Sequence, residues 1–149
     1  MWGAIFVFFV ALITGTLMTQ NSTNTAVDSQ RTEAAAIAGS MQVYRNSVLA
    51  YAQANPSVSG AVPDGNLALP SWYARLNGIS NYISTGKGYV YYTGRSPELA
   101  YQVLKATNNS INVGINQGGN LANPISTTNT TIPIALPGAI PNGSIVIAP

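Results

Sequence analysis

The chain has 149 residues, a formal net charge of +2, only 7% charged residues, and neither Cys nor His. Their absence excludes thiol chemistry, disulfides, imidazole bases and the Cys or His ligands of most zinc sites. The six Lys and Arg residues are scattered without a basic run, so nothing in the sequence supports nucleic-acid binding. We therefore expect a protein that works without a cofactor or metal and is not an enzyme.

The first segment, residues 1–19, is apolar and uncharged: MWGAIFVFFVALITGTLMT. As a helix, Trp2 to Met18 would span about 25 Å, slightly under a hydrocarbon core of roughly 30 Å, and the flanking residues nearly close the gap. A cleavable signal should begin with basic residues and end in a small-residue cleavage site, but no Lys or Arg precedes Arg31. We expect residues 1–19 to be an uncleaved transmembrane anchor, with cleavage as the weaker alternative.

Residues 20–56 should contain a polar break followed by a long amphipathic helix. The string NSTNT interrupts the apolar run, and the capping box Thr25-Ala-Val-Asp28 predicts a helix start at Thr25. The helix should end near Ala54, because Pro56 disfavours helical geometry in the residue before it. Its apolar residues recur at steps of three and four, with Gln30 in the one polar position of the series, and form a heptad-like stripe: Val27, Ala34, Ile37, Met41, Tyr44, Val48 and Tyr51.

The stripe has two interpretations, which can hold together. In the first, it packs on the protein's own sheet, as amphipathic helices usually do. In the second, its N-terminal half, with the small residues 34–36 and Gly39, contacts other membrane-anchored chains, including further copies of this one, while residues 41–51 pack on the sheet. The candidate partner-binding residues on this helix are Ala34, Ile37, Met41 and Tyr44. Replacing Ile37 and Met41 with Asp would unfold the domain in the first case and abolish assembly in the second.

Residues 57–149 predict a small α+β domain with a mostly antiparallel sheet. A loop comes first, and residues 71–78 read as a short helix, with Trp72 and Leu76 entering the core. Residues 81–93 are rich in Tyr, Ile and Val around a tight turn, which predicts a hairpin.

The rest of the domain should be one helix and three strands. Ser96-Pro97-Glu98 is a typical helix start, and the four apolar residues that follow share a face. Ile111, Val113 and Ile115 alternate with polar residues, as in a half-buried strand. Two more strands are expected over 132–136 and 144–148, and Pro133 suggests that the former lies at an edge.

Two features of the hairpin are candidates for chemistry or binding. Ser84-Thr-Gly-Lys87 matches the S-x-x-K spacing of Ser/Lys acyl-transfer enzymes, but their motif opens a helix, whereas this one falls in a turn. A turn is the favoured interpretation and a Ser/Lys hydrolase the minor one. Tyr89 and Tyr91 share one face of their strand. That face is either core, covered by the following helix, or an exposed strip, which makes both residues candidates for partner binding.

The layout resembles type IV pilin-like proteins, and more closely the PilM family of the thin, type IVb pili of conjugative plasmids. The strings that carry the resemblance are the uncharged N-terminal helix, MQVYRNSVLAYAQANP, GYVYYTG and PNGSIVIAP. The family implies a non-enzymatic inner-membrane accessory protein needed for pilus assembly. Prepilins carry Glu five residues after the Gly of their cleavage site, whereas this chain has Gly3 followed by Phe8.

These observations predict a single-pass inner-membrane protein whose domain, residues 57–149, lies in the periplasm. Its partners would be other pilus assembly proteins of the inner membrane and periplasm. The alternative is a processed pilin-like subunit incorporated in the fibre. The two differ in where the mature protein ends up.

Overall fold

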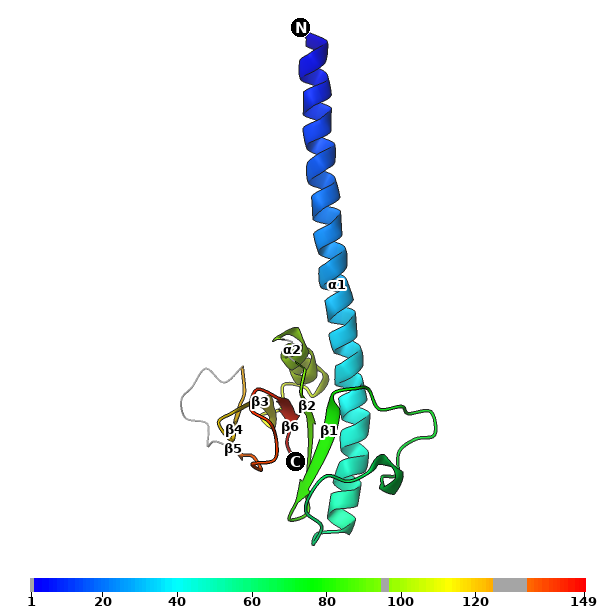
Figure 1. The fold of residues 1–149 in the computed structure, drawn as a ribbon, viewed down its shortest axis with the longest axis vertical. Helices are drawn as coiled ribbons and strands as arrows, with labels where there is room; N and C mark the ends of the chain where they lie inside the picture. The colour runs from blue at the N-terminus through cyan, green and yellow to red at the C-terminus, as the bar shows by residue number, and fades with distance from the viewer. Residues whose placement is uncertain (1, 95–96, 125–133) are drawn as a thin grey trace. The chain divides into compact units, whose positions relative to one another are not determined.

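The structure, a computed structural model, describes the backbone of residues 2–94, 97–124 and 134–149 and the side chains of 27–94, 98–124 and 134–149. The fold is α+β, as predicted, and its parts are labelled in Figure 1. Its elements are α1 (Trp2–Ala54), the 3₁₀ turn η1 (Asp64–Asn66), β1 (Ile79–Ser84), β2 (Lys87–Tyr92), α2 (Pro97–Ala106), β3 (Val113–Gln117), β4 (Asn120–Ala122), β5 (Ile134–Ala135) and β6 (Ile145–Ile147). The chain divides into two compact units, Met1–Glu33 and Ala34–Pro149.

The long helix corrects one prediction and confirms another. The expected break and helix start at Thr25 are wrong, since α1 runs from Trp2 to Ala54 without interruption. Asn, Ser and Thr each cost a helix less than about 0.7 kcal/mol relative to Ala, and the break contains neither Gly nor Pro. The predicted end is confirmed: the helix stops at Ala54, where the Asn55 amide still bonds the Tyr51 carbonyl at 3.0 Å and Pro56 follows.

Among the helices of the described residues, none is long and apolar enough to cross a membrane. The anchor expected over residues 1–19 depends on side chains that lie outside the described ones, so it stays a prediction.

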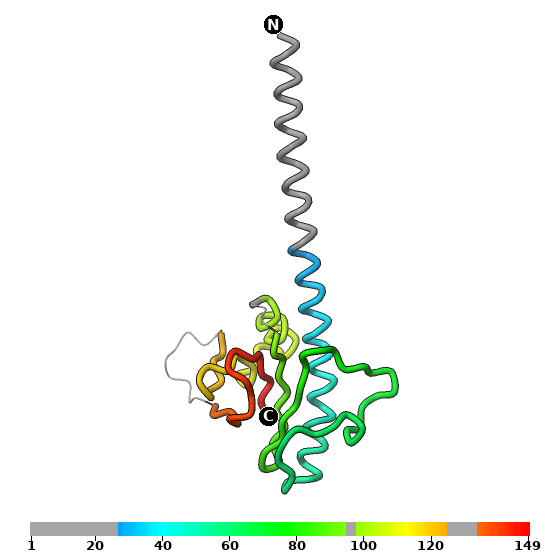
Figure 2. Tube along the Cα trace, in the orientation of Figure 1, coloured from blue at the N-terminus to red at the C-terminus, as the bar shows by residue number. Residues whose placement is uncertain are grey.

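The six strands of the described residues form one sheet in the order β1-β2-β6-β3-β4-β5, and every neighbouring pair is antiparallel. The last strand, β6, lies in the middle, where Val146 pairs with Tyr91 on one side and Gly114 on the other. Figure 2 shows this red C-terminal segment beside the green β2. All three residues of β6 are buried. The end of the chain therefore joins the two hairpins into a single sheet.

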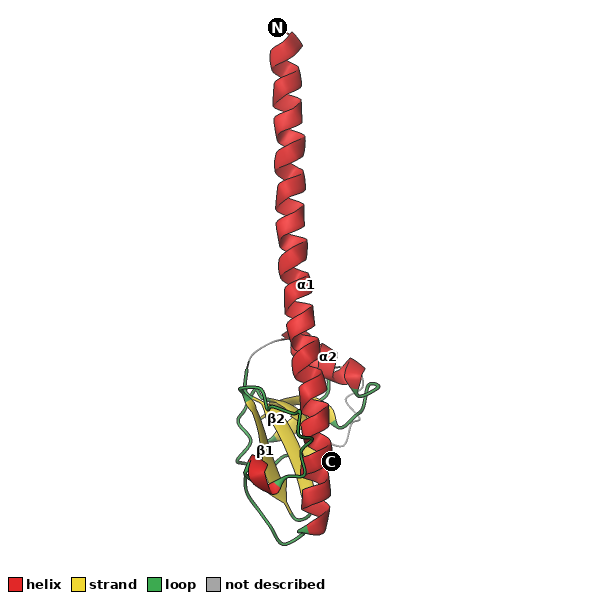
Figure 3. Ribbon diagram, turned by 90° about the vertical axis from the view of Figure 1, so that its right-hand side faces the viewer, coloured by secondary structure: helices red, strands yellow, loops and turns green. Residues whose placement is uncertain are grey.

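The core has two parts, one on each face of the sheet. In the larger, the C-terminal part of α1 covers β1 and β2 (Figure 3), and Met41, Tyr44 and Val48 are each 0% exposed. The predicted apolar face of α2 completes this part with Leu99, Ala100, Val103 and Leu104. The smaller part comprises Tyr89, Leu121, Leu136, Ile140, Val146 and Ala148. The fold therefore supports the first interpretation for the stripe from Ala34 onward, whereas Val27 is 45% exposed.

Both hairpins have the two-residue turns that suit twisted strands. In the predicted β1–β2 hairpin, Ser84 pairs with Lys87, and the turn residues Thr85 and Gly86 have φ values of 50° and 74°. Gly118 and Gly119 join β3 to β4 with φ values of 59° and 86°. Positive φ at both turn positions is the type I′ pattern.

The remaining predictions for the domain hold in part. The edge strand is confirmed, because β5 ends the sheet order, although Pro133 lies outside the described residues, as does Ser96 at the start of α2. The half-buried strand begins two residues later than expected, and Ile111 is 70% exposed.

The short helix expected over residues 71–78 is wrong, since this stretch consists of turns and irregular chain. Trp72 and Leu76, expected in the core, are 73% and 41% exposed. Eight residues form too little helix to repay its nucleation, so non-local contacts decide the conformation. We call residues 67–78 the Trp72 loop.

Candidate interaction site

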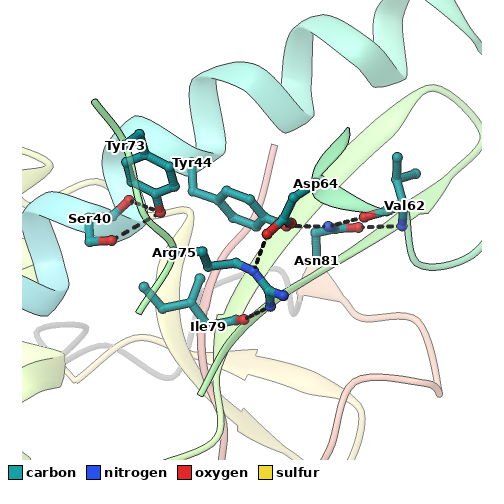
Figure 4. A network of polar contacts seen from close by, with 8 residues as sticks. All are labelled: Ser40, Tyr44, Val62, Asp64, Tyr73, Arg75, Ile79 and Asn81. Carbon is teal, nitrogen blue, oxygen red and sulfur yellow. Dashed lines mark hydrogen bonds and ion pairs between the residues drawn. The ribbon is translucent and has the colours of Figure 1, made fainter. Parts of the chain in front are cut away.

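A partly buried polar network lies beneath the Trp72 loop, on the side of the domain where α1 meets β1 (Figure 4). The Tyr44 hydroxyl donates to Asp64 Oδ1 at 2.7 Å and accepts from Asn81 Nδ2 at 2.6 Å. The Asn81 side chain also bonds the Val62 backbone. Its Oδ1 accepts from the Val62 amide and its Nδ2 donates to the Val62 carbonyl, both at 2.8 Å. The Tyr44 hydroxyl therefore links helix α1 to the turn at Asp64 and to strand β1.

Arg75 connects this network to the loop. Its Nε donates to Asp64 Oδ2 at 2.7 Å and its terminal nitrogen to the Ile79 carbonyl at 2.5 Å. The guanidinium also lies 5.8 Å from the centre of the Tyr44 ring, within the range of a cation–π contact. These contacts fix the C-terminal half of the loop where it enters β1.

Tyr73 fixes the middle of the loop against α1. Its ring stacks on that of Tyr44 at 6.1 Å, and its hydroxyl bonds both the side chain and the carbonyl of Ser40, at 3.0 and 3.1 Å. Nearer the start of the loop, the Ser47 hydroxyl donates to the Ala68 carbonyl at 2.9 Å. Three residues of one α1 face thus hold the loop that precedes β1.

The network keeps its titratable groups in fixed states near neutral pH. Burial, then the hydrogen bond to Asp64, raises the pKa of Tyr44 well above its usual range. Burial alone would raise the pKa of the Asp64 carboxyl, but hydrogen bonds from Tyr44 and Arg75 and the Arg75 charge outweigh it, so the pKa is lowered. The hydrogen bond to Asp64 raises the pKa of Arg75. The result is a neutral phenol beside a charged pair.

The network has a structural role: it supports the surface loop that carries Trp72. A hollow of about 300 Å³ opens beside the network, lined by Tyr44, Asp64, Arg75, Asn81 and Tyr91 among others. Its polar atoms bond mainly to one another. The group displayed to solvent is Trp72, 73% exposed, whose ring meets Tyr73 edge-on at 6.2 Å. Trp is among the residues most enriched at positions that dominate protein–protein affinity, and here it lies on a loop that hydrogen bonds hold to α1.

The predicted partner-binding residues of α1 lie mostly outside the network. Ala34, Ile37, Met41 and Tyr44 are buried in the larger core, at 3%, 9%, 0% and 0% exposure. Tyr44 alone joins the network. Partner binding by these four stays a prediction, and they have almost no exposed area with which to meet a partner.

The two hairpin tyrosines belong to the smaller part of the core. Tyr89 is 6% exposed, and Tyr91 is half-buried beside the hollow. As predicted, both lie on one face and Val90 on the other. The face that they share is covered by residues of the C-terminal segment, such as Leu136 and Ile140, rather than by the helix that follows the hairpin. It is therefore no exposed strip.

The S-x-x-K residues occupy the turn that the sequence favoured. Ser84 and Lys87 are the paired residues that close the β1–β2 turn, and Lys87 is exposed. Among the described residues, no group of three or more acidic side chains could hold a metal ion.

Sequence reasoning missed Asp64, Arg75, Asn81 and the display of Trp72. Tyr44 lies 20 residues from Asp64 and 37 from Asn81, so no local pattern joins them. One signal was available: a tyrosine in the buried stripe needs a partner for its hydroxyl, and the chain offers few acids.

The fold defines a small α+β protein in which a long helix packs on one face of a six-stranded antiparallel sheet and supports a fixed, Trp-bearing loop. The model of the PilM family matches residues 7–148, and the chain belongs to this family.

Solved structures agree with this assignment. A protein from Pseudomonas aeruginosa 2192, described as PilM, is 33% identical, with a TM-score of 0.50 over 78% of this chain and 93% of its own. A second, from Escherichia coli B7A and also described as PilM, shares the fold at 23% identity, with a TM-score of 0.57 over 80% of this chain and 94% of its own. Among curated proteins, none matches the chain.

Proposed function

We propose that this PilM-family chain is a non-enzymatic accessory protein of type IV pilus assembly that acts by binding other assembly proteins. Family membership supports the link to pili. The observation that carries the binding role is the exposure of Trp72, 73%, on a loop that Tyr73 and Arg75 fix to the core. A preformed loop loses little conformational entropy on binding, so its aromatic side chain can contribute most of its contact energy to affinity.

The proposal includes a location. Residues 1–19 would anchor the chain in the inner membrane, and the domain would lie in the periplasm beside other anchored assembly proteins. Confinement to one membrane raises the effective concentration of such partners, so a single aromatic contact patch can suffice. Low charge and the lack of Cys, which leaves the domain without disulfides, are compatible with this compartment and do not require it.

The test replaces Trp72 with Ser in cells that make the pilus and counts pili by electron microscopy. The matched control is Ile111→Ser, which removes another isolated apolar side chain, 70% exposed, outside the loop. We expect Trp72→Ser to reduce pili at least tenfold at unchanged protein level, and Ile111→Ser to leave them near wild type.

Two results would contradict the proposal. Normal piliation of the Trp72→Ser strain would remove the binding role of the loop. Recovery of the protein in sheared fibres, with a shortened N-terminus, would make it a fibre subunit instead.

A further inference from the structure

A second hollow, also of about 300 Å³, lies between α1 and the end of α2. Arg45 lines it from α1, with side-chain amides from Gln42 and Asn46 on the same helix. Because Arg45 follows Tyr44, its side chain leaves the helix about 100° further around than the Tyr44 ring. The hollow therefore belongs to a different face of α1 from the network under the Trp72 loop.

Arg45 is the unusual residue of this hollow. Its side chain is half-buried, and its Nε is fully buried without a hydrogen-bond partner among the described residues. Buried donors in native proteins are nearly always paired, so each exception requires an explanation. Asp64 pairs with Arg75, and in the described part of the chain no carboxylate forms an ion pair with Arg45.

Capping of α2 does not explain Arg45. The last four carbonyls of that helix already have donors: Val103 and Leu104 from the Thr107 hydroxyl, Lys105 from the Asn108 amide, and Ala106 from the Gln42 side chain. The positive φ of Asn108, 52°, turns the chain away after the helix and leaves Thr107, Asn108 and Ser110 on the wall of the hollow. Among the described residues, Arg45 is thus a cation whose Nε has no hydrogen-bond partner and whose charge has no ion-pair partner.

We propose that this hollow binds a carboxylate side chain from an acidic segment of a partner protein, with the Arg45 guanidinium as its main contact. The planar fork of a guanidinium matches a carboxylate, and Arg45 lines the hollow from α1. The surrounding amides and hydroxyls can bond the peptide groups beside that carboxylate. A volume of about 300 Å³ is at the lower limit for ligand pockets and suits one side chain better than a larger molecule. The inference rests on the proposed function only in that the partner is a protein.

The experiment follows the Arg45 Nε–H signal by ¹⁵N NMR in the full-length protein, purified in mild detergent. The probes are the peptide acetyl-Gly-Ser-Glu-Ser-Gly-amide, its Gln counterpart, and sodium acetate. We expect the Glu peptide to shift the Nε–H signal and the amide signals of Thr107 and Asn108. Its Kd should be at least about tenfold lower than that of either other probe, because the Gln peptide lacks the charge and acetate lacks the peptide groups.

Two variants check the assignment. Arg45→Lys keeps the charge and removes the fork and the Nε, so Glu-peptide binding, followed at Thr107, should weaken about tenfold. Lys87→Gln removes a cation from the β1–β2 turn and should leave the Kd unchanged. Unchanged hydrogen exchange in β6 shows that each variant is folded.

Three outcomes would overturn the inference: no shift with any probe, equal binding of the Gln peptide, or equal binding of acetate, which would indicate a site for small free anions. These results are independent of pilus counts. Normal piliation of Trp72→Ser would contradict the proposed function and leave the NMR result standing, and the reverse also holds.

Discussion

Tyr44→Phe should destabilise the domain by about 2.5 kcal/mol, because the phenol hydroxyl is the central atom of the network. A hydrogen bond to a charged group contributes roughly 1.5–3 kcal/mol. Since 37% of the Asp64 side chain is exposed, water can replace part of that bond, and the lower value of about 1.5 kcal/mol applies. One N–H of Asn81, in a residue 4% exposed, would also lose its acceptor, at a cost of about 1 kcal/mol.

Hydrogen exchange of the full-length chain can measure this effect, because β6 lies in the middle of the sheet and its amides should exchange only on unfolding of the domain. A loss of about 2.5 kcal/mol corresponds to exchange about 60-fold faster. The control is Tyr101→Phe, at a tyrosine that is 57% exposed, which should change exchange less than about twofold. If Tyr44→Phe behaved like this control, the network would contribute nothing to stability and the reasoning would be refuted.

Three further predictions concern stability. The lowered pKa of Asp64 adds stability that is present above its ordinary value of 3.8 and is lost as pH falls through the folded-state pKa, so Asp64→Asn should flatten the acid limb of a pH–stability profile. Gly114→Ala would place a Cβ 2.3 Å from the Ala122 carbonyl oxygen and should cost about 1–3 kcal/mol in urea unfolding, whereas Gly138→Ala, with nothing within 4 Å, should be near neutral. Thr85→Asn should stabilise the domain by roughly 1 kcal/mol and so raise its melting temperature. A β-branched residue is unfavourable at φ 50°, whereas Asn-Gly prefers the type I′ turn.

The parts of the fold that local patterns encode were predictable. The β1–β2 hairpin has a tight turn between two runs of Tyr, Ile and Val, and α2 has Pro97 in its first turn with four apolar residues behind it. The stripe on α1 also identified the buried face of that helix. Periodicity says which face is apolar but not what covers it, so Met41 and Tyr44 could be assigned either to the core, as is usual, or to a partner.

The parts that depend on distant contacts were not predictable. The pattern of 144–148 indicates a strand but not its place between β2 and β3, which depends on pairing across the whole domain. The Trp72 loop carries local signals for a helix, yet Tyr73 bonds Ser40, 33 residues earlier in the chain, and Arg75 bonds Asp64. A single tertiary contact of this kind outweighs the weak propensity of eight residues.

The candidate site was predicted least well for the same reason. Of the six proposed binding residues, Tyr44 alone belongs to the network, and as a support instead of a contact. Exposure is a property of the folded surface. Trp72, placed in the core from its pattern, is the most exposed large hydrophobic side chain among the described residues.

The most direct test of the account is photo-cross-linking from position 72 in living, piliated cells. A photoreactive phenylalanine derivative would replace Trp72, with the same replacement at Ile111 as the control, and adducts would be identified by mass spectrometry after fractionation. The account predicts an adduct from position 72 with another pilus assembly protein in the inner-membrane fraction, and none from position 111. No adduct at position 72, or one found in the fibre with the pilin itself, would contradict it.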